Sequence, residues 1–286
     1  MSGWGRRAAQ RVFEIRRERQ AIPNVFPNLA RNPAALATDL RFKGWARAAG
    51  FLGAGLDLLA ALCGTDKFGL HHYTAVYEPL VRPLRRRAIS LLELGVGGYG
   101  HGLGGESLLM WAAYFSGGRI YGIDIEDKSA LSRGRIKVFQ CSQTDRQRLT
   151  ALCDEIGPFD LVIDDGSHLN PHQIESFRIL WPYVKDGGWY VVEDVQTSYW
   201  PSYGGGTPGS PAYASSCMSF FKALADSVNQ CEFLDPARLE TEPSIGEIAF
   251  HHNMIVLRKD ASPRTSNVPL QRESVRAALL KPRSGP

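Results

Sequence analysis

The stretch "ISLLELGVGGYGHGLGG" (residues 89–105) places a short apolar run directly before a loop in which glycine recurs. An unbroken apolar run of this kind is typical of a strand that is buried on both faces of a sheet. Gly95, Gly97 and Gly100 fit the G-x-G-x-x-G spacing, in which glycines let the backbone approach a nucleotide closely. The stretch therefore predicts the first strand and the glycine-rich loop of a nucleotide-binding α/β sheet.

Strand and helix patterns alternate along the chain from this point. The alternation predicts a doubly wound, mostly parallel sheet with helices on both faces. Strand-like sequence resumes late in the chain and predicts an antiparallel C-terminal strand. The expected strands are 118–125, 136–142, 159–165, 187–195 and part of 246–259, and the expected helices are 107–115, 145–156 and 171–183.

The chain ends differ in composition from this region. Apolar residues at helical spacing predict an amphipathic helix at 5–20, and a proline-containing connector follows. The segment 41–63 is predicted to be helical, although Gly50, Gly53 and Gly55 weaken this prediction. The segment 261–286 is polar and contains four prolines. We therefore predict an N-terminal helical extension over 1–63, a core domain over 64–260 and a tail over 261–286. The glycine- and proline-rich stretch 201–211 is expected to form a flap.

The net charge of +4 is too small to indicate a nucleic-acid partner. The charge is uneven, since residues 1–50 hold ten Arg and Lys against three acidic residues. This basic segment forms either a solvated helix face or a contact with an anionic partner or another subunit. The five cysteines lack C-x-x-C spacing, which indicates buried thiols in a reducing compartment. No apolar run reaches membrane-spanning length, so we expect a cytoplasmic protein without stable membrane insertion.

Asp124 follows the second predicted strand, 29 residues beyond Gly95, where a carboxylate can accept both ribose hydroxyls of an adenosine. Two cofactors are compatible with this pairing, a dinucleotide or S-adenosylmethionine. In a dinucleotide site the helix begins inside the glycine motif, but here it begins near Ser107, after a long loop. Glu93 is suited to the ammonium group of a methionine. These features favour S-adenosylmethionine, with an NAD(P)-dependent oxidoreductase as an alternative.

Acidic residues follow the fourth and fifth predicted strands. Asp164 and Asp165 end one strand and Glu193 and Asp194 end the other, with His168 close to the first pair. The carboxyl ends of parallel strands line the ligand crevice of such a sheet, so the four carboxylates should converge beside the cofactor. Their repulsion calls for a cation, and oxygen ligands favour Mg²⁺, with Mn²⁺ or Ca²⁺ as weaker options. His168 could act as a general base, and Asp164 could instead brace the loops.

The motifs "GTDK…HHY", "LLELGVGG", "GGESLLMW", "YGIDIEDKS", "VFQCSQTD", "DLVIDDGSH", "SFRILWP" and "GGWYVVEDVQTSYW" resemble, in order and spacing, the macrocin O-methyltransferase-like family. The resemblance covers roughly residues 64–203. Members of this family are class I methyltransferases that use a metal ion and methylate sugars of macrolides, and relatives act on actinobacterial glycolipids and polysaccharides. One departure is "FQCSQTD", where the family more often has a Gly-Asp pair before the glutamine.

This resemblance implies a Mg²⁺ ion held by Asp165, Glu193 and Asp194, with His168 as base. It also implies an S-adenosylmethionine site and a Rossmann-like fold. The implied cofactor residues are Thr65, Lys67, Glu93, Gly95, Gly97, Ser107, Asp124, Gln143, Asp145 and Asp164.

The function expected from the residues and the resemblance together is O-methylation of a sugar hydroxyl in a glycoside, glycolipid or polysaccharide. A catechol-type phenol O-methyltransferase is the first alternative, because it also uses metal-binding carboxylates. A non-catalytic binding protein is the other. The oligomeric states usual in the resembled family, together with the basic N-terminus, favour a homodimer or homotetramer.

Overall fold

The computed structural model describes residues 40–98, 104–234, 244–262, 265–270 and 272–281. The predicted helix at 5–20, nearly all of the predicted connector and Gly100 lie outside these residues.

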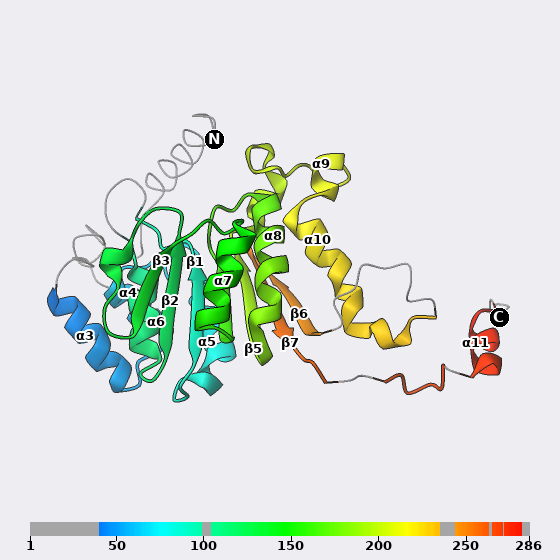
Figure 1. Cartoon of the computed structure of the whole chain (residues 1–286), viewed down its shortest axis with the longest axis horizontal. Helices are drawn as coiled ribbons and strands as arrows, with labels where there is room; N and C mark the ends of the chain where they lie inside the picture. The colour runs from blue at the N-terminus through cyan, green and yellow to red at the C-terminus, as the bar shows by residue number, and fades with distance from the viewer. Residues whose placement is uncertain (1–39, 99–103, 235–243, 263–264, 271, 282–286) are drawn as a thin grey trace.

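A mixed sheet runs through the middle of the described part of the chain (Figure 1). Its seven strands lie in the order β3-β2-β1-β4-β5-β7-β6. The first five strands are parallel, whereas β7 runs antiparallel to both β5 and β6. The predicted doubly wound sheet is confirmed, and its antiparallel part is a hairpin of two strands. The strands are β1 (Ser90–Leu94), β2 (Arg119–Asp124), β3 (Ile136–Gln140), β4 (Phe159–Asp164), β5 (Val184–Glu193), β6 (Ile245–His251) and β7 (Met254–Lys259).

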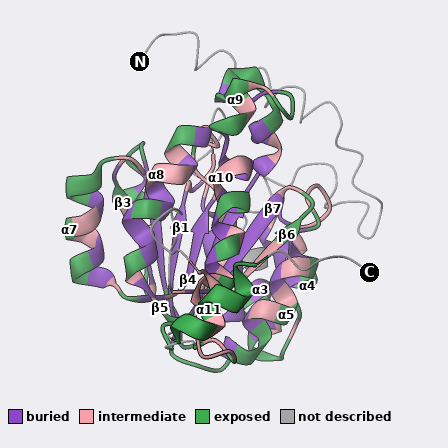
Figure 2. Cartoon of the chain, turned by 90° about the vertical axis from the view of Figure 1, so that its right-hand side faces the viewer, coloured by how far each residue is buried: buried purple, intermediate pink, exposed green. Residues whose placement is uncertain are grey.

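Helices cover both faces of the sheet, and successive strand residues point to opposite faces. Leu91 packs into a core with the helices of one face, and its neighbour Leu92 packs into a second core on the other face. Figure 2 shows the strands as a buried layer between helices with exposed outer surfaces. The first face holds α3 (Leu40–Phe51), α4 (Leu56–Cys63), α5 (Thr74–Val81) and α6 (Glu106–Tyr114), and the second holds α7 (Arg146–Ile156), α8 (Asn170–Leu180) and α10 (Cys217–Ala223).

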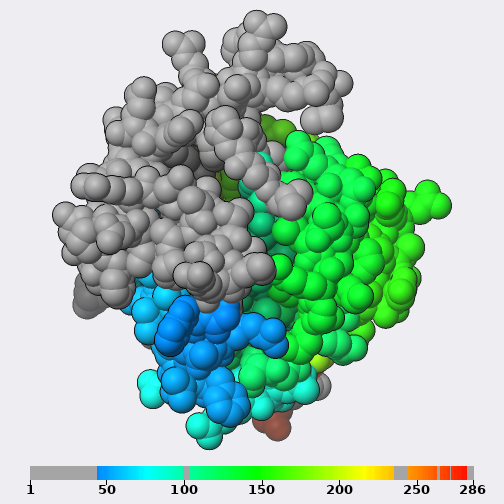
Figure 3. All heavy atoms as spheres, turned by 90° about the vertical axis from the view of Figure 1, so that its left-hand side faces the viewer, coloured from blue at the N-terminus to red at the C-terminus, as the bar shows by residue number. Residues whose placement is uncertain are grey.

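The segment 41–63 forms two helices, α3 and α4, separated by a turn. Gly53 in this turn has a φ of 93°, a conformation that glycine adopts without a steric penalty. The guanidinium of Arg85 donates hydrogen bonds to the carbonyls of Gly50, Gly53 and Ala54 and thereby caps the end of α3. Figure 3 shows α3, in blue, on the outside of the molecule. Both helices pack against α6, and residues of both lie in the same hydrophobic core as Leu91 of β1.

The remaining elements are short. The predicted flap contains the 3₁₀ helix η5 (Pro201–Tyr203) and leads into α9 (Pro211–Ala214). The tail contains one helix that the sequence did not predict, α11 (Glu273–Leu279), which stands apart from the sheet in Figure 1. Within the described ranges, no helix is both long enough and apolar enough to cross a bilayer. The other 3₁₀ helices are η1 (Arg82–Leu84), η2 (Ser129–Leu131), η3 (Trp181–Tyr183), η4 (Val195–Tyr199) and η6 (Leu224–Glu232).

Candidate active site

The candidate site lies at the carboxyl ends of β1, β4 and β5, where β1 has β2 on one side and β4 on the other. This reversal of strand order is the position at which open α/β sheets bind ligands. The loops that leave β1 and β4 touch at Gly95. A Cβ atom there would lie 2.1 Å from the carbonyl oxygen of Asp165, and the φ of Gly95 is 81°. Glycine is therefore required at this position both for space and for backbone conformation.

The glycine loop and Asp124 lie together, as predicted. Asp124 accepts hydrogen bonds from the backbone N–H groups of Val96 and Glu126, at 2.9 Å each. Gly97 has a φ of 74°, and a Cβ there would meet nothing within 4 Å, so the loop leaves open space at this point. The Lys128 ammonium lies 3.3 Å from Asp124 and donates to the carbonyl of Gly97. An acid held beside an open glycine loop fits the ribose of an adenosyl cofactor.

Gln143 and Asp164 connect the loops that follow β3 and β4. The Gln143 side chain accepts from the N–H of Ser167 at 2.7 Å and donates to Asp164 at 3.2 Å. Asp164 is fully buried and also accepts from the Ser176 hydroxyl. Burial raises the pKa of Asp164 to about 6, although the Ser176 hydrogen bond opposes this shift. Asp145 is the N-cap of α7 and accepts from the N–H of Arg148.

Lys67 lies at the centre of a cluster formed by Glu93, Asp165 and Glu193. Its sequence position, far from the last two acids, did not predict this. Its ammonium is 2.8 Å from Glu193, 2.9 Å from Asp165 and 3.2 Å from Glu93. Burial alone would lower the pKa of Lys67, but the three carboxylates outweigh it and the pKa is well above its usual value. Glu93 also accepts from the Ser107 hydroxyl at 2.9 Å, and the hydroxyl oxygen of Thr65 accepts from the Lys67 N–H at 3.5 Å.

Asp165, His168 and Asp194 form a second group beside Lys67. Each offers one possible metal-ligand atom, and these atoms lie within 4.8 Å of one another. His168 Nε2 is 3.7 Å from Asp194 Oδ2 and 4.0 Å from Asp165 Oδ1. The carboxylate oxygens of Asp165 and Asp194 suit a hard divalent cation such as Mg²⁺, whereas an imidazole nitrogen suits softer metals. Asp165 and His168 are partly exposed, and Asp194 is buried. Glu193 differs from them, because its oxygens contact Lys67 and accept from the Tyr77 hydroxyl at 2.5 Å.

The segment that carries Lys67 supplies further side chains, whose contacts with Asp194 and Glu193 the sequence did not predict. The Tyr73 hydroxyl donates to Asp194 at 2.7 Å, and burial together with Asp194 raises the pKa of Tyr73. The His71 ring stacks on Tyr73 with 4.8 Å between ring centroids, and His71 Nδ1 is 3.7 Å from Asp194. Because the contacts of Tyr73 and Tyr77 span 121 and 116 residues, local spacing could not predict them.

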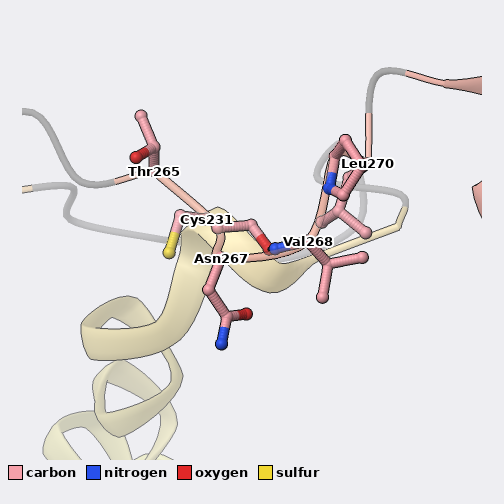
Figure 4. A pocket seen from close by; sticks show the side chains of 7 residues that line it. Cys231, Thr265, Asn267, Val268 and Leu270 are labelled. Atoms are coloured by element: carbon pink, nitrogen blue, oxygen red, sulfur yellow. The ribbon is translucent and has the colours of Figure 1, made fainter.

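A surface pocket lies elsewhere, between the end of η6 and the segment 265–270 (Figure 4). It is lined by Cys231 and by residues 265–270, and none of the predicted site residues contributes to it. This pocket therefore does not belong to the candidate active site.

No family model matches the chain. Among curated proteins, the chain is 40% identical over 224 residues to 8-demethyl-8-alpha-L-rhamnosyl tetracenomycin-C 2'-O-methyltransferase of Streptomyces olivaceus, covering 77% of this chain and 58% of that protein. It is 46% identical over 171 residues to demethylmacrocin O-methyltransferase of Streptomyces fradiae, covering 59% and 43%. The chain thus spans about half the length of the curated relatives it matches.

Among solved structures, the chain matches MycE methyltransferase from the mycinamycin biosynthetic pathway, in complex with Mg, SAH and mycinamycin VI. The TM-score is 0.65 at 38% identity, and the match covers 72% of this chain and 54% of that one. The curated relatives and the solved structure are thus all methyltransferases, at 38–46% identity. The resemblance to the macrocin O-methyltransferase-like family is therefore confirmed over the matched region.

Proposed function

We propose that the chain is an O-methyltransferase that uses S-adenosylmethionine and Mg²⁺ to methylate a hydroxyl of a sugar-containing acceptor. The observation that carries this proposal is the position of Asp165, His168 and Asp194, which lie at the strand ends next to the glycine loop. The names of the relatives support the reaction and the sugar, because these proteins are O-methyltransferases of glycosylated compounds. The finer proposals are an acceptor that is a glycoside, glycolipid or polysaccharide, a cytoplasmic location and a homodimer or homotetramer.

S-adenosylmethionine would lie along the loops after β1, β2 and β3. Asp124 is placed to accept the ribose hydroxyls, and Gly97 leaves room for the cofactor beside the loop. Glu93 is placed to receive the methionine ammonium. Gly95 sets the path of the loop, Gln143 and Asp164 hold the neighbouring loop, and Asp145 caps the adjacent helix. Ser107 and Lys67 complete the proposed set through their contacts with Glu93, and Thr65 through its hydrogen bond with the Lys67 N–H.

Asp165, Glu193 and Asp194 are the proposed ligands of Mg²⁺. Asp165 and Asp194 already present oxygens to a common point, whereas Glu193 joins them only if Lys67 or Tyr77 releases one of its oxygens. When bound, a divalent cation lowers the pKa of a hydroxyl that coordinates it.

His168 is the proposed base. Its Nε2 atom faces Asp165 and Asp194, so this nitrogen is placed to take the proton from the acceptor hydroxyl. The two carboxylates stabilise the imidazolium that forms. Beyond this proton transfer, the chain aligns the acceptor oxygen with the sulfonium methyl group and keeps water from the reaction.

A methyl-transfer assay tests the proposal. Labelled S-adenosylmethionine is supplied with a panel of glycosides, polysaccharide fragments and catechols. We expect transfer to sugar hydroxyls that EDTA abolishes and added Mg²⁺ restores. Transfer to catechols alone would establish the phenol alternative, and full activity in EDTA would remove the metal from the mechanism. Binding of NAD without binding of S-adenosylhomocysteine in calorimetry would favour an oxidoreductase.

A further inference from the structure

Lys67 occupies a position in which its ammonium faces carboxylates from three neighbouring strand ends. Glu93 belongs to β1, Asp165 follows β4 and Glu193 ends β5. The ammonium contacts all three at 2.8–3.2 Å. The Lys67 side chain is 1% exposed, and those of Glu93 and Glu193 are 0% and 2% exposed. Carboxylates buried to this extent need a positive charge in contact with them.

Asp165 is shared between two sets of contacts, one with Lys67 and one with His168 and Asp194. Its Oδ2 accepts from Lys67 at 2.9 Å, while its Oδ1 faces His168 Nε2 at 4.0 Å. One side of this carboxylate thus meets the ammonium, and the other side helps to form the Asp165–His168–Asp194 group. A carboxylate shared between two cation positions is the arrangement that enzymes with paired metal ions use, with the ions about 4 Å apart. Here one of the two positions holds a side-chain ammonium.

We propose that Lys67 is a built-in monovalent substitute for a second divalent cation, and that it restricts the site to a single metal ion. This inference rests on the proposed function, because it takes Asp165 and Asp194 as metal ligands. The charges agree with it. Glu93, Asp165 and Glu193 contact the ammonium, and Asp194 lies beside Asp165 in the other group. Four carboxylates and one ammonium leave enough negative charge for one further divalent ion. Without the ammonium, the oxygens of Glu93, Asp165 and Glu193 would surround a second position of the kind that hard cations occupy.

The variant Lys67→Gln tests this role through metal stoichiometry rather than activity. Mn²⁺ serves as the probe, because it prefers the same oxygen ligands as Mg²⁺ and its free and bound forms are counted by electron paramagnetic resonance. The full-length wild-type chain should bind about one Mn²⁺ per chain and Lys67→Gln about two, as in sites built for paired ions. Lys67→Arg keeps the positive charge and should remain at about one.

Lys185→Gln is the matched control. Lys185 also pairs with a carboxylate, Asp160 at 2.7 Å, but it is 36% exposed and contacts none of the four acids of the site. Its removal should leave the Mn²⁺ stoichiometry unchanged. A folded Lys67→Gln variant that still binds about one Mn²⁺ would overturn the inference while leaving the proposed function intact. A wild-type chain that binds no Mn²⁺ would overturn the proposed metal site and this inference together.

A measurement on the wild type covers the case in which Lys67→Gln does not fold. At saturating Mn²⁺, the wild-type spectrum should show only isolated ions, and a spin-coupled Mn²⁺ pair would refute the role of Lys67.

If Lys67→Gln does fold, Mn²⁺ should raise its melting temperature more than it raises that of wild type, because a second ion then replaces the lost ammonium.

Discussion

His168 and Asp194 both have left-handed backbone conformations, with φ values of 57° and 56°. Such values are uncommon outside glycine and cost about 1–3 kcal/mol, so they persist only where surrounding contacts hold them. In this chain the two residues lie next to each other in the candidate active site, with 3.7 Å between His168 Nε2 and Asp194 Oδ2. The backbone strain thus coincides with the atoms to which we assign the chemistry.

His168→Asn tests the assignment of the base, since asparagine tolerates the left-handed backbone and removes the imidazole. The kcat for methyl transfer should fall about 10²- to 10⁴-fold, the range lost with a general base. The affinity for S-adenosylhomocysteine should stay near the wild-type value, because His168 lies on the metal side of the site. Calorimetry and the methyl-transfer assay together measure both quantities.

His252→Asn is the control for this variant, because His252 is exposed in the turn between β6 and β7. It should leave kcat unchanged. A loss of cofactor affinity in His168→Asn comparable to the loss of kcat would show that His168 belongs to the cofactor site instead.

The sequence predicted the acids of the site but not the groups that neutralise them. Asp165, Glu193 and Asp194 follow strands whose apolar pattern is local, so their convergence could be expected from strand order. Lys67 meets Asp165 across 98 residues and Glu193 across 126. The packing of helices on the sheet decides which basic or phenolic side chain reaches a buried acid. This packing cannot be predicted from sequence spacing. Lys67 was accordingly predicted only as a cofactor residue, on the basis of the family resemblance.

At the scale of elements, the loop between β1 and α6 depends on glycine for two different reasons. Gly95, in this loop, has a left-handed φ of 81° and lacks space for a Cβ. Gly187, within β5, serves as a comparison, because it has a similar φ of 73° but open space around it. The two positions therefore separate the cost of backbone conformation from the cost of crowding.

Gly187→Ala should lower the free energy of unfolding by about 1–2 kcal/mol, the cost of a left-handed alanine. Gly95→Ala should lower it by about 2–5 kcal/mol, because crowding against the Asp165 carbonyl is added to the same conformational cost. Urea denaturation of both variants measures the difference. Equal losses of unfolding free energy in the two variants would contradict this prediction, because they would mean that the β1 and β4 loops move apart at no cost.

Asn170 at the start of α8 joins the flap to the site. Its amide nitrogen donates to the carbonyls of Thr197 and Tyr203, at 3.1 and 2.9 Å. Its amide oxygen accepts from the Ser198 hydroxyl at 3.0 Å and from the Cys217 N–H at 2.7 Å. The side chain is fully buried, and these four hydrogen bonds satisfy every donor and acceptor of the amide.

Asn170→Ala should lower the free energy of unfolding by about 3 kcal/mol or more, since it leaves several buried polar groups without partners. Asn267→Ala, at an exposed position, should stay within about 0.5 kcal/mol of wild type. An Asn170→Ala variant of wild-type stability would show that water or neighbouring groups replace the amide.

Elements with strong local signals were predicted closely, and those that depend on a turn or on packing were not. The strands and the long helices α6, α7 and α8 follow from their apolar patterns. The β6–β7 hairpin lacks a glycine dipeptide, and its turn is made by His252 and Asn253, the latter with a φ of 59°. The turn between α3 and α4 depends on Arg85, which lies 31 residues from Ala54 along the chain. Gly53 marks the end of α3, but the hydrogen bonds that Arg85 adds there are not visible in the local sequence.

At the scale of the whole molecule, four of the five cysteines lie in the two cores on either side of the sheet. Cys63 packs in one core, and Cys141, Cys153 and Cys217 pack in the other. All five cysteines are free thiols, and Cys231, which lines the pocket of Figure 4, is the more accessible one. This arrangement agrees with the buried thiols that the sequence predicted.

The native chain should therefore have about one thiol, Cys231, that reacts quickly with a disulfide reagent near pH 8, because only an accessible thiolate attacks. Burial raises the pKa of Cys141 and Cys217, and it raises the pKa of Cys153 to about 12. A raised pKa means less thiolate below that pH, so these thiols should react only when the chain unfolds in guanidinium. Cys231→Ser should remove the fast phase and leave the slow one. A second fast thiol in Cys231→Ser would mean that one of the two cores opens far more readily than its packing indicates.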